Sequence, residues 1–398
     1  MARLETRGRL AAAMAMLALA QPAAAEPPAV PPTPAPAATA EYQLYQPQDA
    51  DERGLWMTVD EAERSLRNSP SVIRDPALNA YVRGVLCKTV GADRCRNVRL
   101  YIVRTPQFNA TMAPNGMMEV WSGLLLRTQN EAQLAAVLGH EYTHFEKRHT
   151  VKLFRDIKAK TDAASFLSLI PYAGIAGLAM VSSVFGFSRD MEREADTGGL
   201  AKMADAGYDT REAATVWERL REEMDATAVA RNTKSRKDKN GGLFATHPPS
   251  AERVENLRAA AAANPGVAGA NDAEAYRHAL APLWPAFVDD QLKLNDFGAS
   301  EYLLTSLASA GWTPALLYAR GELYRRRALP GDLEKAVGFY GEAVAAGGTM
   351  PELWRGRGMA LQKLGQADAG RADLREYLRR APSAPDKPMI AMLAGEGS

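Results

Sequence analysis

Residues 131–149 read EAQLAAVLGHEYTHFEKRH and contain the pattern HExxH. Helical residues four positions apart share one face, so His140 and His144 can both reach one metal ion while Glu141 lies over the same site. Zinc accepts neutral imidazole in a tetrahedral shell and, in catalytic sites, keeps one position for water. The stretch therefore predicts a zinc-binding helix with His140 and His144 as ligands and Glu141 as the general base.

A second stretch, SRDMEREAD at residues 188–196, can supply the third ligand that HExxH lacks. Glu192 and Asp196 are four residues apart and share a helical face, whereas Glu194 is rotated by about 200° and points away. We assign Glu192 as the third ligand, and Asp196 as a carboxylate that accepts the free ring N–H of a ligating histidine. Without HExxH, the stretch would indicate a surface helix with paired charges.

His149 follows His144 by five residues, with no glycine between them. A metzincin would place its third histidine six residues after the second, with a glycine between. On a continuous helix His149 lies about 140° away from His144. We therefore expect a structural or solvent-facing role for His149 and no metal binding.

The patterns HEYTH and SRDMEREAD are followed by THPPS at residues 246–250 and preceded by FNATMAPNGMMEVWSGLLL at residues 108–126. Together they resemble metallopeptidase family forty-eight, the gluzincins that include BepA-like periplasmic proteases. The resemblance covers roughly residues 75–257 and is more specific than HExxH alone. It implies a zinc-dependent endopeptidase with one Zn²⁺ per chain, Glu192 matching the third ligand and Asp196 the supporting carboxylate.

The resemblance also implies a role for the segment that precedes the metal-binding helix. In the family, this segment looks like the edge strand along which an extended substrate lies. The implied substrate-binding strand is formed by Met117, Met118, Glu119 and Val120.

His247, within THPPS, has two alternative catalytic roles. The tetrahedral intermediate of peptide hydrolysis needs a hydrogen-bond donor beside the metal, and His247 is the candidate. The resemblance to BepA-like proteins implies another role, in which His247 occupies the open zinc position in a closed, latent state. Arg253, six residues later, is expected to stabilise the same region. The non-functional alternative for His247 is a turn residue before a proline pair.

The 398-residue chain has 48 basic and 47 acidic side chains, and this balance argues against broad electrostatic binding of nucleic acid. At about 150 residues per domain, the length favours two or three domains. Residues 1–25 carry the pattern of a cleavable signal peptide, with arginines before an apolar run of 11 residues. That run is too short to span a bilayer of about 30 Å, so we expect a periplasmic protein without a transmembrane span. The Pro- and Ala-rich residues 26–50 should form a disordered tether.

An oxidising compartment changes the interpretation of the only two cysteines, Cys87 and Cys95. A turn at Gly91, between them, would bring them within bridging distance. We expect a local disulfide; the alternative is two buried free thiols.

Local patterns predict a mainly α protein with a small β-sheet, an α+β fold. Asp75-Pro76 and Asn130 are helix-start signals, and Thr58-Val59-Asp60-Glu61 is a capping-box pattern that predicts another. Residues 98–104 and 117–121 read as strands, with a turn at Asn115-Gly116.

Residues 163–188 carry no charge, yet a single crossing of a membrane would separate His140 from Glu192. Two crossings need about 40 apolar residues. We expect a hairpin or kinked helix, broken at Pro171, packed on the core; peripheral membrane contact is the alternative. Residues 231–240 read as a mobile, solvated loop; its position just before His247 permits a lid function, and the alternative is a loop that is merely flexible.

The C-terminal third shows a degenerate helical repeat that resembles tetratricopeptide units. The first unit is echoed by the second in the pairs Gly321 and Gly358, Tyr324 and Leu361, Ala336 and Gly370, Tyr340 and Leu374, and Ala343 and Tyr377. We expect a gluzincin-type peptidase domain at residues 51–263, a helical tetratricopeptide-like domain at residues 264–385 and a flexible tail at residues 386–398. A plain helical bundle is the alternative to the repeats.

The sequence is compatible with two alternative functions. The first is an exported zinc metalloendopeptidase that cleaves unfolded, misfolded or stalled envelope proteins, with the repeats contacting the outer-membrane assembly machinery. The second is a helical chaperone or adaptor with a vestigial or structural metal site. The intact Glu141 favours the enzyme, because a structural zinc site needs no general base and fills all four positions with protein ligands.

Overall fold

The computed structural model describes residues 44–160, 187–238, 247 and 249–396. The predicted signal peptide, most of the predicted tether and the uncharged segment up to residue 186 lie outside these residues. Within the described ranges, no helix is both long and apolar enough to cross a bilayer.

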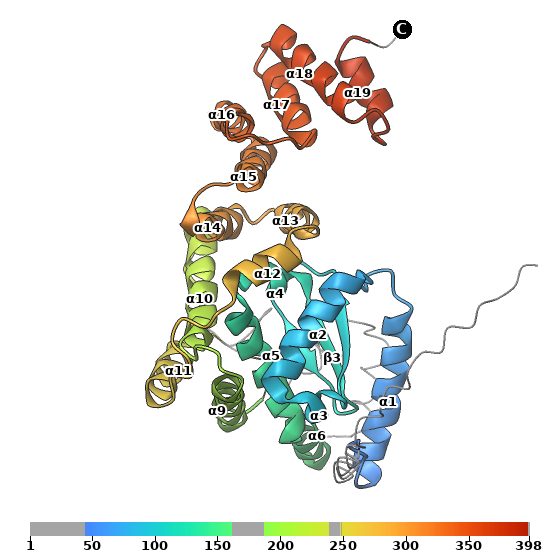
Figure 1. Cartoon of the computed structure of the whole chain (residues 1–398), viewed down its shortest axis with the longest axis vertical. Helices are drawn as coiled ribbons and strands as arrows, with labels where there is room; N and C mark the ends of the chain where they lie inside the picture. Colours follow the sequence, from blue (N-terminus) through green and yellow to red (C-terminus); the bar gives the residue numbers. More distant parts are fainter. Residues whose placement is uncertain (1–43, 161–186, 239–246, 248, 397–398) are drawn as a thin grey trace, which may run out of the picture. The chain divides into compact units, whose positions relative to one another are not determined.

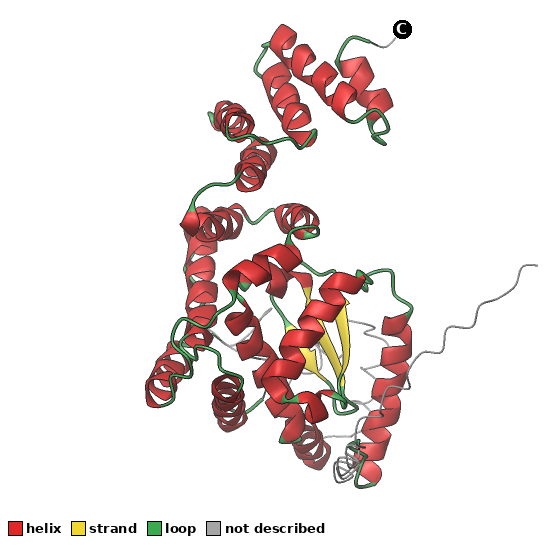
Figure 2. Cartoon of the chain, viewed as in Figure 1, coloured by secondary structure: helices red, strands yellow, loops and turns green. Residues whose placement is uncertain are grey.

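The only sheet among the described residues has three strands in the order β1-β3-β2 (Figure 2). β1 (Arg99–Val103) is parallel to β3 (Met117–Trp121), and β2 (Ala110–Met112) is antiparallel to β3. Both longer strands lie where the alternating sequence predicted them. β2 is a three-residue strand that the sequence analysis did not separate from the turn that follows it.

Alternation along β3 divides the hydrophobic core into two parts. Met118 and Val120 face a cluster that contains residues of α2 (Pro76–Val90) and α5 (Glu131–Glu146). Met117 and Trp121 face a second cluster, which contains residues of α1 (Ala50–Arg67) and α6 (His149–Lys160). The helix with HExxH therefore lies on one face of the sheet, and α1 and α6 lie on the other.

The prediction that β3 forms the substrate-binding edge strand is wrong. β3 is the central strand, so its main-chain N–H and C=O groups are paired with β1 on one side and β2 on the other. The outer edge of β1 is covered by residues 71–73, where the Ile73 N–H donates to the Ile102 carbonyl at 2.8 Å. Among the described residues, the outer edge of β2 pairs with no other strand.

Helix starts follow the capping residues at two of the predicted positions, Asp75 and Asn130, and also at Ser188, where no helix start was predicted. Asp75 accepts from the Leu78 N–H at 2.8 Å before Pro76, and Asn130 accepts from the Gln133 N–H at 2.8 Å. Ser188 caps the helix with the second metal motif, α9 (Arg189–Asp205). Side-chain acceptors satisfy backbone N–H groups that have no partner in a first helical turn.

The predicted helix start at Thr58 is wrong. α1 begins at Ala50, because Asp49 accepts from the Glu52 N–H at 3.0 Å and caps the first turn. Thr58 lies inside the helix, where its hydroxyl donates to the Gly54 carbonyl at 3.1 Å. Residues 44–50 are also not disordered as predicted, since the Tyr45 N–H donates to the Asn97 side chain at 2.8 Å.

Cys87 and Cys95 form the predicted disulfide, with their Cα atoms 5.0 Å apart. The bond joins the last turn of α2 to the short helix α3 (Ala92–Cys95). Gly91, between the two helices, has a φ of 91°, a conformation that side chains with a Cβ rarely adopt.

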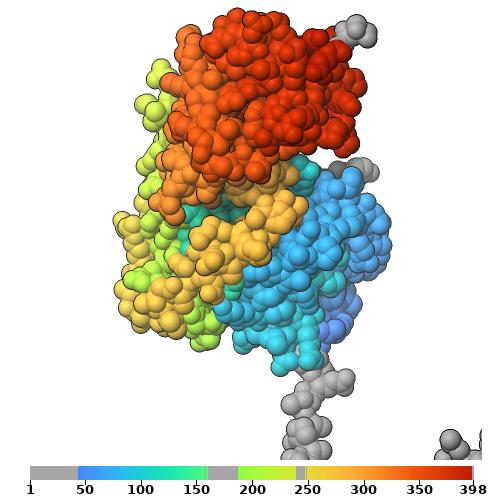
Figure 3. All heavy atoms as spheres, turned by 45° about the horizontal axis from the view of Figure 1, so that its top comes forward, coloured from blue at the N-terminus to red at the C-terminus, as the bar shows by residue number. Residues whose placement is uncertain are grey.

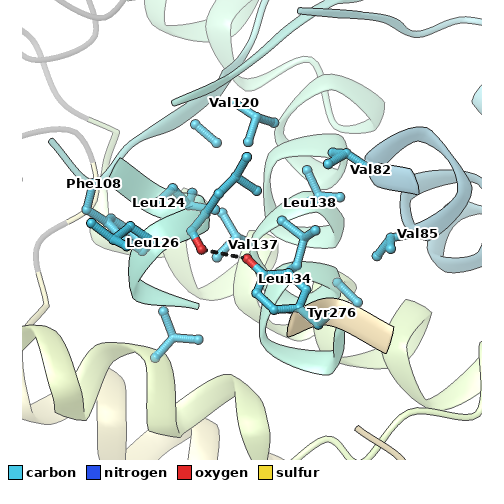
Figure 4. Close-up of a cluster of buried hydrophobic side chains, with 14 of the residues drawn as sticks. Val82, Val85, Phe108, Val120, Leu124, Leu126, Leu134, Val137, Leu138 and Tyr276 are labelled. Carbon is cyan, nitrogen blue, oxygen red and sulfur yellow. Dashed lines mark hydrogen bonds between the residues drawn. The ribbon is translucent and has the colours of Figure 1, made fainter. Parts of the chain in front are cut away.

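The core around the HExxH helix also includes Tyr276 of α12 (Ala273–Leu280), as Figure 4 shows. Its buried hydroxyl donates to the Leu125 carbonyl at 2.8 Å, in α4 (Ser122–Arg127). The same cluster continues through Phe287, Leu303 and Leu323. In the space-filling view, the yellow-orange helices lie directly on the blue and cyan segments (Figure 3). The boundary predicted after residue 263 therefore falls inside one continuous core.

The remaining elements are helical, and α9 and α10 pack against α5 (Figure 1). They are α10 (Glu212–Ala230), α11 (Ala251–Ala263), α13 (Trp284–Lys293), α14 (Phe297–Leu307), the 3₁₀ turn η2 (Ala308–Ala310), α15 (Pro314–Arg327), α16 (Asp332–Ala345), α17 (Glu352–Lys363), α18 (Ala367–Arg380) and α19 (Lys387–Leu393). α15 packs on α16 and α17 on α18, an arrangement consistent with helical repeats.

Small residues in the predicted repeat lie where two helices approach closely. A Cβ on Gly321 would lie 2.6 Å from the ring of Tyr340, and one on Gly358 would lie 2.9 Å from the Gly370 carbonyl. The flexible tail predicted from residue 386 is not observed up to residue 396. α19 forms there because Ile390 is fully buried against the preceding helices.

Candidate metal centre

The close crossing of α5 and α9 brings the two metal motifs together. A Cβ added to Gly199 of α9 would lie only 2.9 Å from the backbone nitrogen of His140. A Cβ on Gly139 of α5 would lie 3.3 Å from the Cα of Gly199. Gly139 and the pair Gly198-Gly199, beside the metal motifs, are the signal in the sequence that could have predicted this close packing.

Four side chains converge on one point: His140, His144, Glu192 and His247. Each offers one ligand atom, and these atoms lie within 4.8 Å of one another. The Nε2 atom of His140 lies 3.0 Å from Nε2 of His144 and 3.1 Å from Nδ1 of His247. The Glu192 carboxylate lies 2.9 Å from Nδ1 of His247 and 3.5 Å from Nε2 of His144.

These separations fit a tetrahedral zinc ion. Zinc–nitrogen bonds of about 2.0–2.1 Å place two ligand atoms of a tetrahedron about 3.3 Å apart. The distances between the four ligand atoms bracket this value, and all four side chains are buried. The three ligands assigned from the sequence all belong to the group, and His247 occupies the fourth corner.

Glu141 lies beside this group and is almost fully buried. Its Oε1 atom is 3.4 Å from Nε2 of His247. Burial raises the pKa of Glu141 above its usual value, although His247 and His140 act in the opposite direction. A carboxylate with a raised pKa is better matched to taking and releasing a proton near neutral pH.

Asp196 and Arg253 form a buried ion pair behind His140. The Nδ1–H of His140 donates to Oδ1 of Asp196 at 2.9 Å, and the Arg253 Nη2 donates to the same oxygen at 2.6 Å. Burial would raise the pKa of Asp196, but the charge of Arg253 and the bond from His140 lower it to about 2. The Arg253 guanidinium also lies 3.6 Å from the ring centroid of Trp217, a residue that the sequence analysis did not identify.

His149 lies directly behind His144 and is fully buried, so the solvent-facing alternative is wrong. Its Nδ1 atom is 2.9 Å from Nδ1 of His144, and its Nε2 atom is 3.0 Å from the Glu194 carboxylate. The expected rotation assumed one continuous helix, but α5 ends at Glu146. Arg148 then has a φ of 56°, and this turn directs His149 back toward His144.

Arg221 of α10 contacts the chain on both sides of residues 239–246. Its Nη1 atom donates to the Lys237 carbonyl at 3.3 Å and to the Pro249 carbonyl at 2.7 Å. Residues 231–238 form turns and contain no helix or strand. Lys237 and Pro249, which precede and follow His247 in the chain, are thereby both attached to the helix that also carries Trp217.

The segment before α1 lies next to His144. A small pocket is lined by Tyr45, Met112, His144 and Arg148, among others. The Tyr45 ring contacts Phe145 at a centroid distance of 5.5 Å, and burial raises the pKa of its hydroxyl above the usual value. No motif in the sequence marked this residue.

An HExxH helix, a crossing helix with a carboxylate ligand and a small sheet define the class of gluzincin-type zinc metallopeptidase domains. Residues 74–261 match the model of Peptidase family M48.

Curated relatives include bacterial and mitochondrial proteases. The mitochondrial metalloendopeptidase OMA1 of Schizosaccharomyces pombe is 32% identical over 186 residues, which cover 44% of this chain and 51% of the relative. The beta-barrel assembly-enhancing protease of Escherichia coli K12 is 27% identical over 172 residues, covering 39% and 35%. A similar Vibrio cholerae relative is 28% identical over 246 residues, covering 56% and 49%. The chain thus spans about half the length of the Vibrio cholerae and Schizosaccharomyces pombe relatives.

Proposed function

We propose that this protein is an exported zinc metalloendopeptidase that hydrolyses peptide bonds of misfolded or stalled envelope proteins. The observation that carries the proposal is the convergence of His140, His144 and Glu192 on one point, with the buried carboxylate of Glu141 beside it. A purely structural zinc site would not need that carboxylate.

The chain's own residues supply the proton transfers of peptide hydrolysis. When bound, zinc supplies the Lewis acid that polarises the scissile carbonyl and makes water more acidic. Glu141 takes a proton from the attacking water onto its carboxylate as the new carbon–oxygen bond forms. It then gives this proton to the leaving nitrogen as the carbon–nitrogen bond breaks. Asp196 orients His140 throughout, because its carboxylate holds the Nδ1–H of that ring.

For His247 we favour the latent role over the role of transition-state donor. Its Nδ1 atom lies among the ligand atoms, 2.9 Å from the Glu192 carboxylate and 3.1 Å from Nε2 of His140. A side chain in this position occupies the corner that a substrate carbonyl or water needs. The resting enzyme is closed, and withdrawal of His247 opens the site.

The outer edge of β2 is the proposed binding place for an extended substrate, in place of β3. The Ala113 N–H donates to the Met117 carbonyl, and the Trp121 N–H donates to the Asn109 carbonyl. Since main-chain groups alternate in direction along a strand, those of Ala110 and Met112 point away from β3. β2 packs against α5, so a polypeptide added to this edge lies next to the metal helix.

The substrate class and the location rest on the relatives and on the N-terminal pattern. The bacterial relatives are named for enhancement of beta-barrel assembly, and a signal-peptide pattern is present at residues 1–25. We propose a periplasmic protein whose C-terminal helices contact the outer-membrane assembly machinery. A direct test is co-purification of that machinery with the full chain, and its absence from the purified protein would contradict the proposal.

The enzymatic part is tested by zinc content and by cleavage of an unfolded polypeptide, compared between the mature protein and Glu141→Gln. Both proteins should bind one zinc ion per chain, and only the wild type should cleave, because glutamine cannot accept the proton. If the wild type and His247→Ala both bound zinc but neither cleaved an unfolded substrate, the result would favour the adaptor function.

A further inference from the structure

His149 has both of its ring nitrogens occupied by specific partners, although it lies outside the proposed ligand group. Nδ1 is 2.9 Å from Nδ1 of His144, and Nε2 is 3.0 Å from the carboxylate of Glu194. The ring is fully buried. Buried polar atoms with matched partners indicate a defined hydrogen-bond chain rather than accidental packing.

Only one arrangement of protons satisfies this chain with neutral rings. His144 offers Nε2 to the metal group, so its proton is on Nδ1. That N–H must donate to Nδ1 of His149, which therefore carries no proton. The proton of His149 is then on Nε2, and it donates to Glu194. The partners fix both tautomers.

The far end of the chain is anchored by a lysine. Nζ of Lys147 lies 2.9 Å from Oε1 of Glu194, while the bond from His149 reaches Oε2. The turn at Arg148 places Lys147 and His149 on the same side of Glu194. This geometry requires the end of α5 and the start of α6 together, so it does not follow from helical spacing.

We propose that His149 is a positioning residue, which fixes the orientation and tautomer of His144 and links it to Glu194. This inference rests on the metal site of the proposed function and extends it to the other ligating histidine. His140 is held by a carboxylate directly, whereas His144 is held by a carboxylate through a second imidazole. Residues that hold the second nitrogen of a ligating histidine set both its orientation and its basicity.

Two substitutions separate the hydrogen bond from packing. His149→Phe keeps an aromatic ring of similar volume but removes the acceptor for His144. His149→Asn loses ring volume but places an amide oxygen near the position of Nδ1, where it can accept the same N–H. We measure zinc affinity by competition with a chromophoric chelator, and the stability of the zinc-free protein by urea unfolding.

The expected result is that His149→Phe weakens zinc binding about 10- to 100-fold, while His149→Asn retains affinity closer to the wild type. A packing role predicts the reverse order. Equal zinc affinity in His149→Phe and the wild type, or equal losses in both variants, would overturn the inference. If the wild type itself bound no zinc, the metal site of the proposed function would fail instead.

The surface end of the chain gives a second test that does not disturb the core. Glu194→Ala should also weaken zinc binding, by a smaller factor than His149→Phe, because the side chain of Glu194 is 42% exposed. The matched control is Asp190→Ala, an 87% exposed carboxylate of the same helix that pairs with Arg193. Two-bond ¹H–¹⁵N spectra of the 5 histidines should show His144 protonated at Nδ1 in the zinc-loaded wild type. A proton on Nε2 would contradict the proposed chain.

Discussion

The two ligating histidines of the metal helix are supported in opposite ways. Behind His140, the carboxylate of Asp196 and the guanidinium of Arg253 are both buried, with side-chain exposures of 13% and 5%. Behind His144, the charges of Glu194 and Lys147 are 42% and 46% exposed, and His149 separates them from the metal group. One side uses a buried ion pair, and the other uses a neutral ring that leads to the surface.

This difference determines where substitutions should be costly. A buried charge that loses its partner is strongly destabilising, because water cannot replace that partner. An exposed ion pair contributes little, since water solvates both charges when the pair is broken. We therefore expect the His140 side to govern stability, and the His144 side to affect mainly metal binding.

The largest effect should come from Arg253→Met. Methionine keeps much of the volume over Trp217 but leaves Asp196 buried without its counter-charge. We expect the free energy of unfolding of the zinc-free protein to fall by about 3–5 kcal/mol in urea denaturation. The matched change on the other side, Lys147→Met, should cost less than about 1 kcal/mol. Similar losses of stability in Arg253→Met and Lys147→Met would contradict the proposed difference between the two sides.

Glu119 tests whether the charge of Arg253 explains the low pKa of Asp196, because burial alone should raise the pKa of a carboxyl group. It is buried in β3, and burial raises its pKa to about 7, opposed only by a hydrogen bond from Trp121. The folded state therefore holds a proton that the unfolded state releases at lower pH. The stability that this group contributes is present in acid and is lost as pH rises through about 7.

Glu119→Gln should remove this pH dependence. The free energy of unfolding of the wild type should decline relative to the variant between pH 5 and pH 8, by about 2–3 kcal/mol. Urea unfolding at several pH values measures the difference. A constant difference across this range would show that the Glu119 carboxylate has an ordinary pKa.

Gly199→Ala tests the helix crossing that both sides share. The new Cβ would lie 2.9 Å from the backbone nitrogen of His140, so α9 must shift away from α5. We expect a loss of about 1–3 kcal/mol in stability, together with weaker zinc binding. Gly338→Ala in α16 is the control, because a Cβ there meets nothing within 4 Å. It should be neutral or slightly stabilising, and equal effects at both positions would contradict the crossing.

The smallest effect is the difference between two isosteric changes. Asp196→Asn should weaken zinc binding by about 10-fold, since it removes a charge that contacts His140 directly. Glu194→Gln should weaken it less, because this carboxylate is exposed and acts through His149. Chelator competition gives both affinities. A larger loss in Glu194→Gln would reverse the assignment of the two sides.

Features that depend on spacing within one helix could be predicted from the sequence. His140, Glu141, His144, Glu192 and Asp196 lie as their four-residue intervals indicated. The helix starts at Asp75 and Asn130 followed from local capping chemistry in the same way. In each case, a spacing of three or four residues within one helix determines which groups lie close together on that helix.

Features that depend on two elements could not be derived from spacing. The position of His149 follows from a left-handed turn at Arg148. The helix ends at this turn, whereas the sequence pattern predicted one continuous helix through His149. The central place of β3 follows from its pairing with β2, a strand of only three residues. Trp217 supports Arg253 from a helix that carries no metal motif.

The most direct test of the central claim compares cleavage of an unfolded polypeptide by four zinc-loaded proteins. They are the wild type, His247→Ala, Glu141→Gln and the double variant with both changes. The account predicts that His247→Ala cleaves faster than the wild type, and that neither protein with Glu141→Gln cleaves. Slower cleavage by His247→Ala would contradict the closed resting state, and cleavage that persists in the double variant would contradict Glu141 as the general base.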